Sequence, residues 1–336
     1  MRVNIMRKET YKIWSEEEYS NPLPGKFVPH ITAYLHEDET VRDTIVIVPG
    51  GGYRLVACAE GEIVAEKFFE KGYNTFVLTY TTALFTADTV LGKQPLKDLA
   101  QAVKMIRLQA DRFRIRPDHL AVMGFSAGGH LCGSLAVHWD DPSICPEISD
   151  DGRICRPDAV ILSYPVITAG TYAHQDSFQV LLGAEAGQEE KEYFSIETQV
   201  TEQTPPSFVW HTAADETVPV ENSLLYEEGL RKAKVPCELH IFPEGPHGYS
   251  LADDTWASGT YGGDYTMDQW FAYMQVYLDK GEELPPPFQD MHLPKGTDYR
   301  EFYRNSPKDY LKGTPNSAVA VWPDLADRWL KNLFSK

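Results

Sequence analysis

Short apolar runs alternate with longer segments of helical periodicity along most of the chain. Residues 43–48 (DTIVIV) and 74–80 are rich in β-branched and apolar residues, which is typical of buried strands. Between them, residues 60–71 repeat apolar side chains at helical spacing and stop at Gly72. A glycine directly after the last helical residue marks a common helix end. These patterns predict a strand, a helix and a second strand.

The same alternation continues toward the end of the chain. We expect helix 95–113, strand 120–124, helix 127–138, strand 159–163, strand 207–211, helix 221–233, strand 238–242 and helix 323–334. Buried strands that alternate with helices indicate a mostly parallel sheet that is covered on both faces. The predicted fold class is therefore α/β, with a doubly wound sheet flanked by helices.

Two stretches interrupt this rhythm. Residues 168–206 are polar and partly helical, and residues 250–318 are dense in Trp, Tyr and Pro, with a predicted helix at 267–278. Both follow predicted strands, and the carboxyl ends of parallel strands border the ligand crevice in α/β proteins. We expect a single domain over residues 1–336, with a small cap at 168–206 and an aromatic-rich insertion at 250–318.

Composition and charge narrow the choice of partners. Of the 336 residues, 43% are hydrophobic and 24% charged, which is enough apolar material for a sizeable core. The formal net charge of −18 argues against nucleic acid, because a surface that follows phosphates needs clustered Lys and Arg. The same charge disfavours anionic substrates. A neutral small molecule fits best.

Cysteine usage and the chain start bear on the compartment. Residues 1–14 lack the apolar core and cleavage site of a secretory signal, and no apolar run has the length of a membrane span. We therefore expect a cytoplasmic protein that does not enter a membrane. The five cysteines form no C-x-x-C pair, so free thiols are favoured over a zinc site, although Cys145 and Cys155 flank an acidic loop and are able to approach each other.

A G-x-S-x-G motif carries the first chemical signal. Gly124-Phe125-Ser126-Ala127-Gly128 lies between a predicted strand and a predicted helix, which is the context that a serine nucleophile on a strained turn requires. The alternative is a glycine-rich turn with an incidental serine. The context favours Ser126 as a nucleophile.

A serine hydroxyl needs a base, and the base needs a carboxylate that fixes its tautomer. In this type of fold the chain order is Ser, acid, His. His247 lies in a loop directly after strand 238–242, whereas His240 and His211 belong to predicted strands and are interpreted as packed or surface residues. We predict His247 as the base.

The acid is expected in the loop after strand 207–211, which precedes strand 238–242 in the chain. Asp215 is the first carboxylate after strand 207–211, and Glu216 is its nearest competitor. Asp215 is favoured because its shorter side chain gives a better oriented hydrogen bond. The alternative is a turn that Asp215 initiates before the next helix.

A triple glycine supplies candidate donors for an oxyanion. Pro49-Gly50-Gly51-Gly52-Tyr53 follows the first core strand, and glycine tolerates the backbone angles that turn N–H groups inward. We assign Gly51, Gly52 and Ala127 as donors. A loop that binds phosphate is the competing interpretation, but neither G-x-x-x-x-G-K-[ST] nor G-x-G-x-x-G occurs at this position.

Together these residues resemble the acetyl esterases and carbohydrate esterases of the α/β-hydrolase superfamily, including xylan esterase-like and lipase/esterase proteins. The matching segments are VIVPGGGY (46–53), VMGFSAGGH (122–130), WHTAAD (210–215) and IFPEGPHG (241–248). The resemblance implies an α/β-hydrolase fold and a Ser126–His247–Asp215 triad. One departure is Pro49, which stands where hormone-sensitive-lipase-like enzymes have His, so their substrates are not carried over.

The resemblance implies hydrolysis of short acyl esters, with acetyl groups on sugars or oligosaccharides as the expected substrates. Tyr53, Trp256 and Trp270 are the expected substrate contacts, because aromatic rings with polar tips suit a sugar surface. The alternative for the aromatic residues of the insertion is that they pack it onto the sheet. The alternatives are a serine peptidase of the prolyl-oligopeptidase type and a catalytically silent binding protein. No metal or organic cofactor is implied, and the expected partner is a small ester or an acetylated oligosaccharide. The sequence indicates no oligomeric state.

Overall fold

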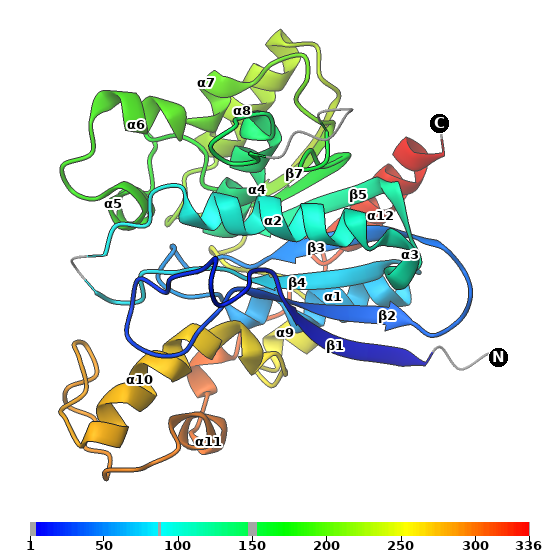
Figure 1. Ribbon diagram of the computed structural model, residues 1–336. Coiled ribbons are helices and arrows are strands. Elements are labelled where there is room, and N and C mark those ends of the chain that lie inside the picture. Colours follow the sequence, from blue (N-terminus) through cyan, green and yellow to red (C-terminus); the bar gives the residue numbers. More distant parts are fainter. Residues whose placement is uncertain (1–4, 87–88, 147–152, 336) are drawn as a thin grey trace.

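The fold is built on a twisted eight-stranded sheet in a computed structural model that describes residues 5–86, 89–146 and 153–335 (Figure 1). The strand order is β1-β2-β4-β3-β5-β6-β7-β8, and every neighbouring pair from β4 to β8 is parallel, whereas β2 runs antiparallel to β1 and β4. The strands are β1 (Met6–Lys12), β2 (His30–His36), β3 (Arg42–Val48), β4 (Asn74–Thr79), β5 (Ile115–Phe125), β6 (Ala159–Ser163), β7 (Ser207–Thr212) and β8 (Cys237–Phe242).

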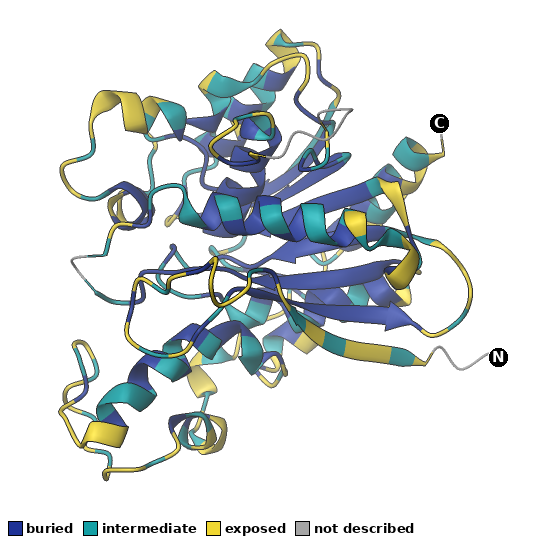
Figure 2. Cartoon of the chain, viewed as in Figure 1, coloured by how far each residue is buried: buried dark blue, intermediate teal, exposed yellow. Residues whose placement is uncertain are grey.

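Helices cover both faces of this sheet because its central strands are apolar on both sides. Val46 and Val48 point into a core with α2, α4 and α8, while Ile45 and Ile47 point into a second core with α1 and α12. Figure 2 shows the buried strands between these helices. The helices are α1 (Glu62–Glu70), α2 (Gln94–Leu108), α4 (Ala127–His138), α8 (Glu221–Lys232) and α12 (Trp322–Phe334), with the short α3 (Ala110–Phe113) at the end of α2.

The predicted α/β class is confirmed, and each predicted core strand and helix is present within a few residues of its expected bounds. The N-terminal part was incompletely predicted, because β1 and β2 were not expected. β2 is buried along its whole length although it carries His30, Thr32 and His36. These polar residues conceal the strand from an analysis of hydrophobic pattern, whereas the sheet accepts them because β2 is covered on both faces.

The two irregular stretches fold into short helices at one end of the sheet (Figure 1). Residues 168–206 contain α5 (Gln175–Leu182), α6 (Gln188–Tyr193) and α7 (Ile196–Gln199). Residues 250–318 contain α9 (Asp254–Ala257), η2 (Asp264–Met267), α10 (Asp268–Lys280), α11 (Tyr299–Asn305) and η3 (Asp309–Leu311), and α10 is the helix expected at 267–278. In the described part of the chain, no helix has the length and apolar character needed to cross a membrane.

The expectation of free thiols is wrong for two of the five cysteines. Cys145 and Cys155 form a disulfide, with their Cα atoms 6.5 Å apart. Arg107 fixes the second segment by donating to the carbonyls of Arg153, Ile154 and Arg156, which brings Cys155 to the turn that follows α4. Cys58, Cys132 and Cys237 are free. The pairing depends on this tertiary contact and is therefore not visible in the cysteine spacing.

The chain order of the strands creates a crevice at one end of the sheet. β3 lies between β4 and β5, so the connection from β3 to β4 runs to one side of β3 and the connection from β4 to β5 crosses to its other side. The end of β3 is level with the end of β5, because Val48 pairs with Gly124. Loops that follow β3 and β5 diverge at such a point and leave room for a ligand. The glycine loop and Ser126 therefore lie side by side at the crevice.

Candidate active site

Ser126 occupies a strained turn between β5 and α4. Its backbone has φ 52° and ψ −120°, a conformation that a non-glycine residue rarely adopts. The flanking glycines permit this turn because the neighbouring backbone is very close. A Cβ at Gly124 would lie 2.1 Å from the carbonyl oxygen of Gly128, and a Cβ at Gly128 would lie 2.1 Å from that of Val48.

The structure brings Ser126, His247 and Asp215 within hydrogen-bond distance of one another. His247 Nε2 lies 2.7 Å from Ser126 Oγ, and His247 Nδ1 lies 2.6 Å from Asp215 Oδ2. A carboxylate accepts, so Nδ1 carries the ring proton and Nε2 is left to accept the proton of the serine. Each side chain comes from a loop at the carboxyl end of a strand, namely β5, β7 and β8. This arrangement is the one that activates a serine hydroxyl.

Asp215 is held by more partners than the sequence suggested. Its Oδ1 accepts from the backbone N–H groups of Thr217 and Val218, both at 2.9 Å, and its Oδ2 also lies 3.3 Å from His211 Nε2. Burial raises the pKa of Asp215, but hydrogen bonds from His211 and His247 outweigh it and hold the pKa well below its usual range. The competitor Glu216 is exposed to solvent.

His211 was not predicted to be near the candidate site. It is the penultimate residue of β7, and its fully buried ring also contacts Ser223 Oγ at 2.7 Å and the carbonyl of Val218 at 3.0 Å. The sequence did hold a signal of this contact, because His211 lies four residues before Asp215 at the end of the same strand. His211 therefore supports the same carboxylate oxygen, Asp215 Oδ2, that His247 contacts.

The glycine loop lies beside Ser126, with the N–H of Gly50 bound to Glu60 and the next two N–H groups open. Gly51 and Gly52 have φ values of 116° and 61°, which explains the glycines at these positions. Among the described residues, no protein acceptor is found for the N–H of Gly51 or of Gly52. Ala127 is the first residue of α4, where the N–H has no partner within the helix. These three groups are available for an oxyanion.

A buried glutamate behind the glycine loop was not identified from the sequence. Glu60 ends η1 (Cys58–Glu60), and its carboxylate accepts from the N–H of Gly50 and from the hydroxyl of Tyr164, both at 2.7 Å. Burial raises the pKa of Glu60, whereas these two hydrogen bonds lower it. A lone glutamate at the start of a predicted helix gives no signal of such a role.

Tyr164 links this glutamate to the histidine loop. Its hydroxyl accepts from the N–H of Ser250 at 2.9 Å, and its ring packs edge-on against the His247 ring, with centroids 5.0 Å apart. Ser250 also donates to the carbonyl of Ala59 at 2.6 Å. The glycine loop and the loop that carries His247 are therefore connected through buried hydrogen bonds.

The three predicted substrate contacts lie in different places. Tyr53 is buried, and its hydroxyl donates to His130 Nδ1 at 2.7 Å, because His130 Nε2 donates to the carbonyl of Phe194. Trp256 is largely buried but lines a cavity next to His247. Trp270 packs in a separate aromatic cluster with Phe271, Phe288, Tyr299 and Tyr303. The structure thus brings only Trp256 toward the candidate site.

Residues 168–206 reach the glycine loop. Arg54, two residues after Gly52, forms a bidentate pair with Asp176 at 2.6 and 3.0 Å, and a Cβ at Gly52 would lie 3.8 Å from the same carboxylate. His174 precedes this carboxylate, and burial lowers its pKa, as does the nearby His247. The proposed cap therefore contacts the backbone that offers the candidate oxyanion donors.

The candidate site offers no evident metal centre. Across 5–86, 89–146 and 153–335, no group of three or more His, Cys, Asp or Glu residues is arranged to hold a metal ion. The oxygens of the two carboxylates of the site, Asp215 and Glu60, already accept the hydrogen bonds described above. We therefore assign no metal or cofactor ligand.

Comparison with known proteins places this geometry in a family. The family model BD-FAE matches residues 33–230. Endo-1,4-β-xylanase B of Butyrivibrio fibrisolvens is 49% identical over 258 residues, which are 76% of this chain and 40% of that protein. The acetylxylan esterase of Xylanibacter ruminicola is 31% identical over 297 residues, or 85% of this chain and 55% of that protein. The chain thus spans about half the length of these relatives.

One solved structure is similar to this chain over nearly the whole length of the solved protein. The acetyl ester-xyloside bifunctional hydrolase of Caldicellulosiruptor lactoaceticus is 36% identical, with a TM-score of 0.64, and the match covers 79% of this chain and 96% of that one. The family match includes β3 to β7 and the glycine loop, and it covers more than half of the chain. The chain therefore belongs to the BD-FAE family and is an α/β hydrolase of the esterase type.

Proposed function

We propose that this protein is a serine esterase that releases acetyl groups from acetylated sugars or oligosaccharides. The observation that carries the proposal is the chain of hydrogen bonds from Ser126 through His247 to Asp215, at 2.7 and 2.6 Å. A hydroxyl that donates to a correctly oriented imidazole is primed to attack a carbonyl carbon. The strained Ser126 backbone adds to this, because it holds the hydroxyl at the crevice.

Acylation begins when Ser126 Oγ attacks the ester carbonyl and His247 Nε2 takes its proton. Asp215 stabilises the imidazolium that forms, and the N–H groups of Gly51, Gly52 and Ala127 donate to the oxyanion. Each such donor is typically worth about 3 kcal/mol in the transition state. His247 then protonates the departing sugar oxygen, which leaves the acetyl group on Ser126.

Deacylation repeats these steps with water. His247 removes a proton from a water molecule that attacks the acyl carbon, the same N–H groups stabilise the second oxyanion, and the proton returns to Ser126 Oγ as acetate leaves. Both half-reactions begin with a neutral His247, whose Nε2 accepts the proton of Ser126 or of water.

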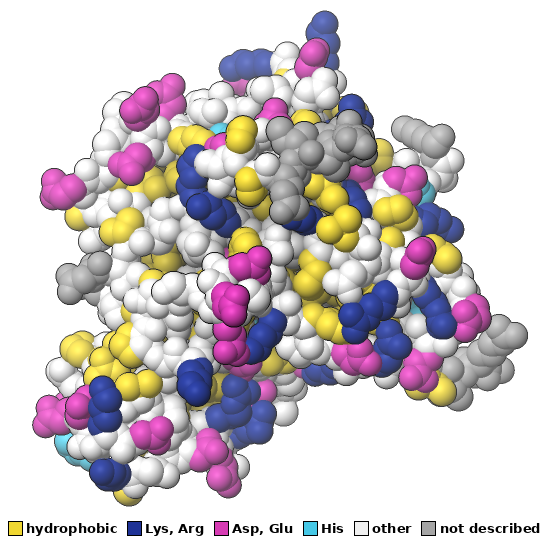
Figure 3. All heavy atoms as spheres, viewed as in Figure 1, with side chains coloured by type: hydrophobic (Ala, Val, Ile, Leu, Met, Phe, Trp, Pro, Cys, Tyr) yellow, Lys and Arg dark blue, Asp and Glu magenta, His cyan; other side chains and the backbone are white. Residues whose placement is uncertain are grey.

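The sugar part of the proposal rests on the relatives. One is named an acetylxylan esterase and another an acetyl ester-xyloside hydrolase. Figure 3 adds that cationic and anionic side chains are mixed over the face it shows, rather than gathered in a basic stripe. A neutral, hydroxyl-rich alcohol suits this surface better than a phosphorylated one.

A substrate screen tests the proposal. Acetyl, butyryl and octanoyl nitrophenyl esters are compared with acetylated xylo-oligosaccharides and with peptide amides. We expect the acetyl esters to be cleaved fastest, and Ser126→Ala to lower turnover by about 10⁴-fold or more without unfolding the protein. A fluorophosphonate probe is expected to label Ser126. Near-full activity in Ser126→Ala would refute the serine mechanism, and preferred cleavage of amides would favour a peptidase of the prolyl-oligopeptidase type.

Two further proposals concern organisation and compartment. We propose one catalytic domain over residues 1–336, with residues 168–206 as a cap and 250–318 as an insertion beside the crevice. The sequence led us to expect the cytoplasm, whereas a Cys145–Cys155 disulfide is typical of oxidising compartments. Fractionation of cells that express the natural gene distinguishes the two.

A further inference from the structure

Three cavities follow one another from the candidate catalytic histidine into the 250–318 insertion. The first, of 470 Å³, is lined by His247, Pro246 and Tyr249 among others. The second, of 550 Å³, shares Pro246 and Tyr249 with the first and adds Tyr261 and Tyr310. The third, of 380 Å³, shares Tyr261 with the second. Pro246, Tyr249 and Tyr261 stand where neighbouring cavities adjoin, and we call the three cavities together the insertion groove.

Aromatic rings line the insertion groove along its length. Tyr249 and Trp256 form a buried part of the wall, with ring centroids 5.0 Å apart, and Trp256 packs so tightly on Gly313 that a Cβ there would lie 2.4 Å from the indole. Tyr310 differs, since 72% of its surface is exposed. An exposed tyrosine ring offers a flat apolar face and a polar tip to a ligand in the cavity. Tyr310 is therefore free to stack on a ligand.

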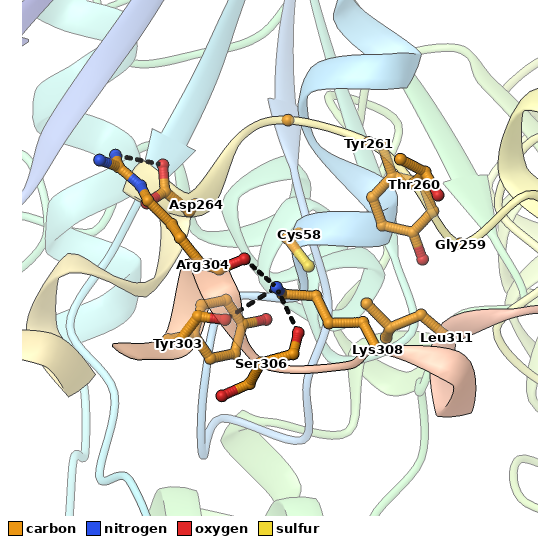
Figure 4. A pocket seen from close by; sticks show the side chains of 11 residues that line it. Cys58, Gly259, Thr260, Tyr261, Asp264, Tyr303, Arg304, Ser306, Lys308 and Leu311 are labelled. Atoms are coloured by element: carbon orange, nitrogen blue, oxygen red, sulfur yellow. Dashed lines mark hydrogen bonds and ion pairs between the residues drawn. The ribbon is translucent and has the colours of Figure 1, made fainter. Parts of the chain in front are cut away.

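The far cavity presents polar groups whose hydrogen bonds are largely made within the protein (Figure 4). Arg304 is bound to Asp264 at 2.7 and 3.2 Å, and Lys308 donates to the carbonyls of Tyr303, Arg304 and Ser306 at 2.8–3.2 Å. Both cations are thus neutralised or fully hydrogen-bonded. The hydroxyls of Thr260 and Ser306 complete the wall. Such a cavity favours a neutral, hydroxyl-rich ligand that replaces its hydrogen bonds to water by hydrogen bonds to the protein.

We propose that the insertion groove binds the glycan chain next to the acylated sugar, so that the enzyme prefers esters on oligosaccharides of several residues. This inference rests on the proposed function. A ligand with its acyl carbon at Ser126 extends past His247 and reaches Tyr249 first, then Tyr310, then the cavity at Ser306. Alternating aromatic faces and hydroxyl groups match the apolar faces and polar edges of successive sugar rings.

The length of the oligosaccharide substrate provides the first test. For the wild-type protein, kcat/KM is measured for deacetylation of acetylated xylose, xylobiose and xylotetraose, with nitrophenyl acetate as the small reference ester. We expect kcat/KM to rise with chain length, mostly through a lower KM. A value that is the same for xylose and xylotetraose esters overturns the proposal, even if nitrophenyl acetate is cleaved efficiently.

Groove variants provide the second test. Tyr310→Ala is expected to raise KM for the tetrasaccharide ester about three- to tenfold, as loss of one aromatic contact implies, while Tyr310→Phe retains the wild-type value. Ser306→Trp fills the far cavity and is expected to remove the advantage of the tetrasaccharide over the disaccharide. All three variants keep wild-type kinetics on nitrophenyl acetate. Leu108→Ala trims another exposed apolar side chain, outside the groove, and serves as the matched control.

A binding measurement separates failure of the groove from failure of the proposed function. Calorimetry with unesterified xylotetraose compares the Ser126→Ala protein with Ser126→Ala/Tyr310→Ala, and neither measurement needs turnover. Weaker binding to the double variant supports the groove even if no ester is hydrolysed. Equal affinities, or no binding of xylotetraose at millimolar concentration, overturn it. Absence of nitrophenyl acetate hydrolysis in the wild type refutes the proposed function alone.

Discussion

The hydroxyl of Tyr164 donates a 2.7 Å hydrogen bond to Glu60, and this bond joins the two halves of the candidate site. On one side, Glu60 fixes the glycine loop through the N–H of Gly50. On the other, Tyr164 fixes the histidine loop through Ser250 and contacts the ring of His247. An oxyanion site acts through donors that are already in place before the reaction, so a residue that holds the donor loop affects the rate.

Glu60→Gln is expected to lower kcat on nitrophenyl acetate about tenfold or more and to leave KM within about threefold. An amide cannot accept from both Gly50 and Tyr164, so the donor loop loses its alignment in the transition state rather than in the ground state. Steady-state kinetics with separate kcat and KM measure this. Glu70→Gln, at the exposed end of α1, is the control, and equal effects of the two variants would contradict a positioning role for Glu60.

Asp215→Asn is expected to lower kcat by about 10³-fold or more, because an asparagine cannot stabilise the imidazolium or fix the proton on His247 Nδ1. Glu216→Gln is expected to change kcat less than twofold, since Glu216 is exposed. A greater loss in Glu216→Gln than in Asp215→Asn would show that the acid is misassigned.

His247→Ala is expected to lower kcat as much as Ser126→Ala does, because the residues act as a unit.

Stability is expected to depend on pH through Asp215. Its pKa in the folded protein lies below the ordinary value, so the unfolded chain binds the proton first as the pH falls. The stabilisation is therefore present above about pH 4 and is lost at lower pH. In urea titrations, the free energy of unfolding of the wild type should exceed that of Asp215→Asn by more than about 1 kcal/mol at pH 7, and the gap should narrow by pH 3. A gap that is constant with pH would exclude this coupling.

Removal of the Cys145–Cys155 disulfide is expected to destabilise the protein by about 2–3 kcal/mol, because the bridge closes a loop with a sequence separation of only 10. The double variant Cys145→Ser/Cys155→Ser should unfold at lower urea concentration than the oxidised wild type. A reducing agent should shift the wild type to the same midpoint and leave the variant unchanged. Labelling of both cysteines in the oxidised, folded protein would contradict the bridge.

The sequence predicted the fold and the candidate triad because local chemistry dictates both. Gly124 and Gly128 are required by backbone contacts of the turn itself, and Asp215 and His247 follow strands whose apolar pattern is plain. These features repeat whenever a serine must stand at the end of a parallel strand. Pattern, spacing and chain order therefore sufficed to select them.

Long-range contacts escaped the same reasoning. Glu60 lies 104 positions from Tyr164, and the sequence around either residue does not indicate that they form a hydrogen bond. The Cys145–Cys155 bridge, which the sequence left open, depends on the contact of Arg107 with residues 153–156. β2 was missed because its polar residues break the apolar pattern. Residue type also proved a weak guide in the insertion. Of its two selected tryptophans, Trp256 lines the groove and Trp270 packs elsewhere.

The two tryptophans are expected to respond differently to replacement by alanine. Trp270 contacts Phe288, Tyr299 and Tyr303, so its loss should lower the free energy of unfolding by about 2–4 kcal/mol, because a cavity forms in this cluster. The KM of the folded variant should stay within twofold for both nitrophenyl acetate and acetylated xylotetraose.

Trp256→Ala removes a wall of the insertion groove beside Tyr249 and leaves Gly313 without its packing partner. It should therefore raise KM for the tetrasaccharide ester more than for nitrophenyl acetate, because the small ester does not extend along the groove. Urea unfolding measured beside the kinetics separates lost stability from lost recognition. A selective rise in KM in Trp270→Ala, with none in Trp256→Ala, would reverse the roles assigned to these residues. It would also move the glycan from the insertion groove to the face of α10.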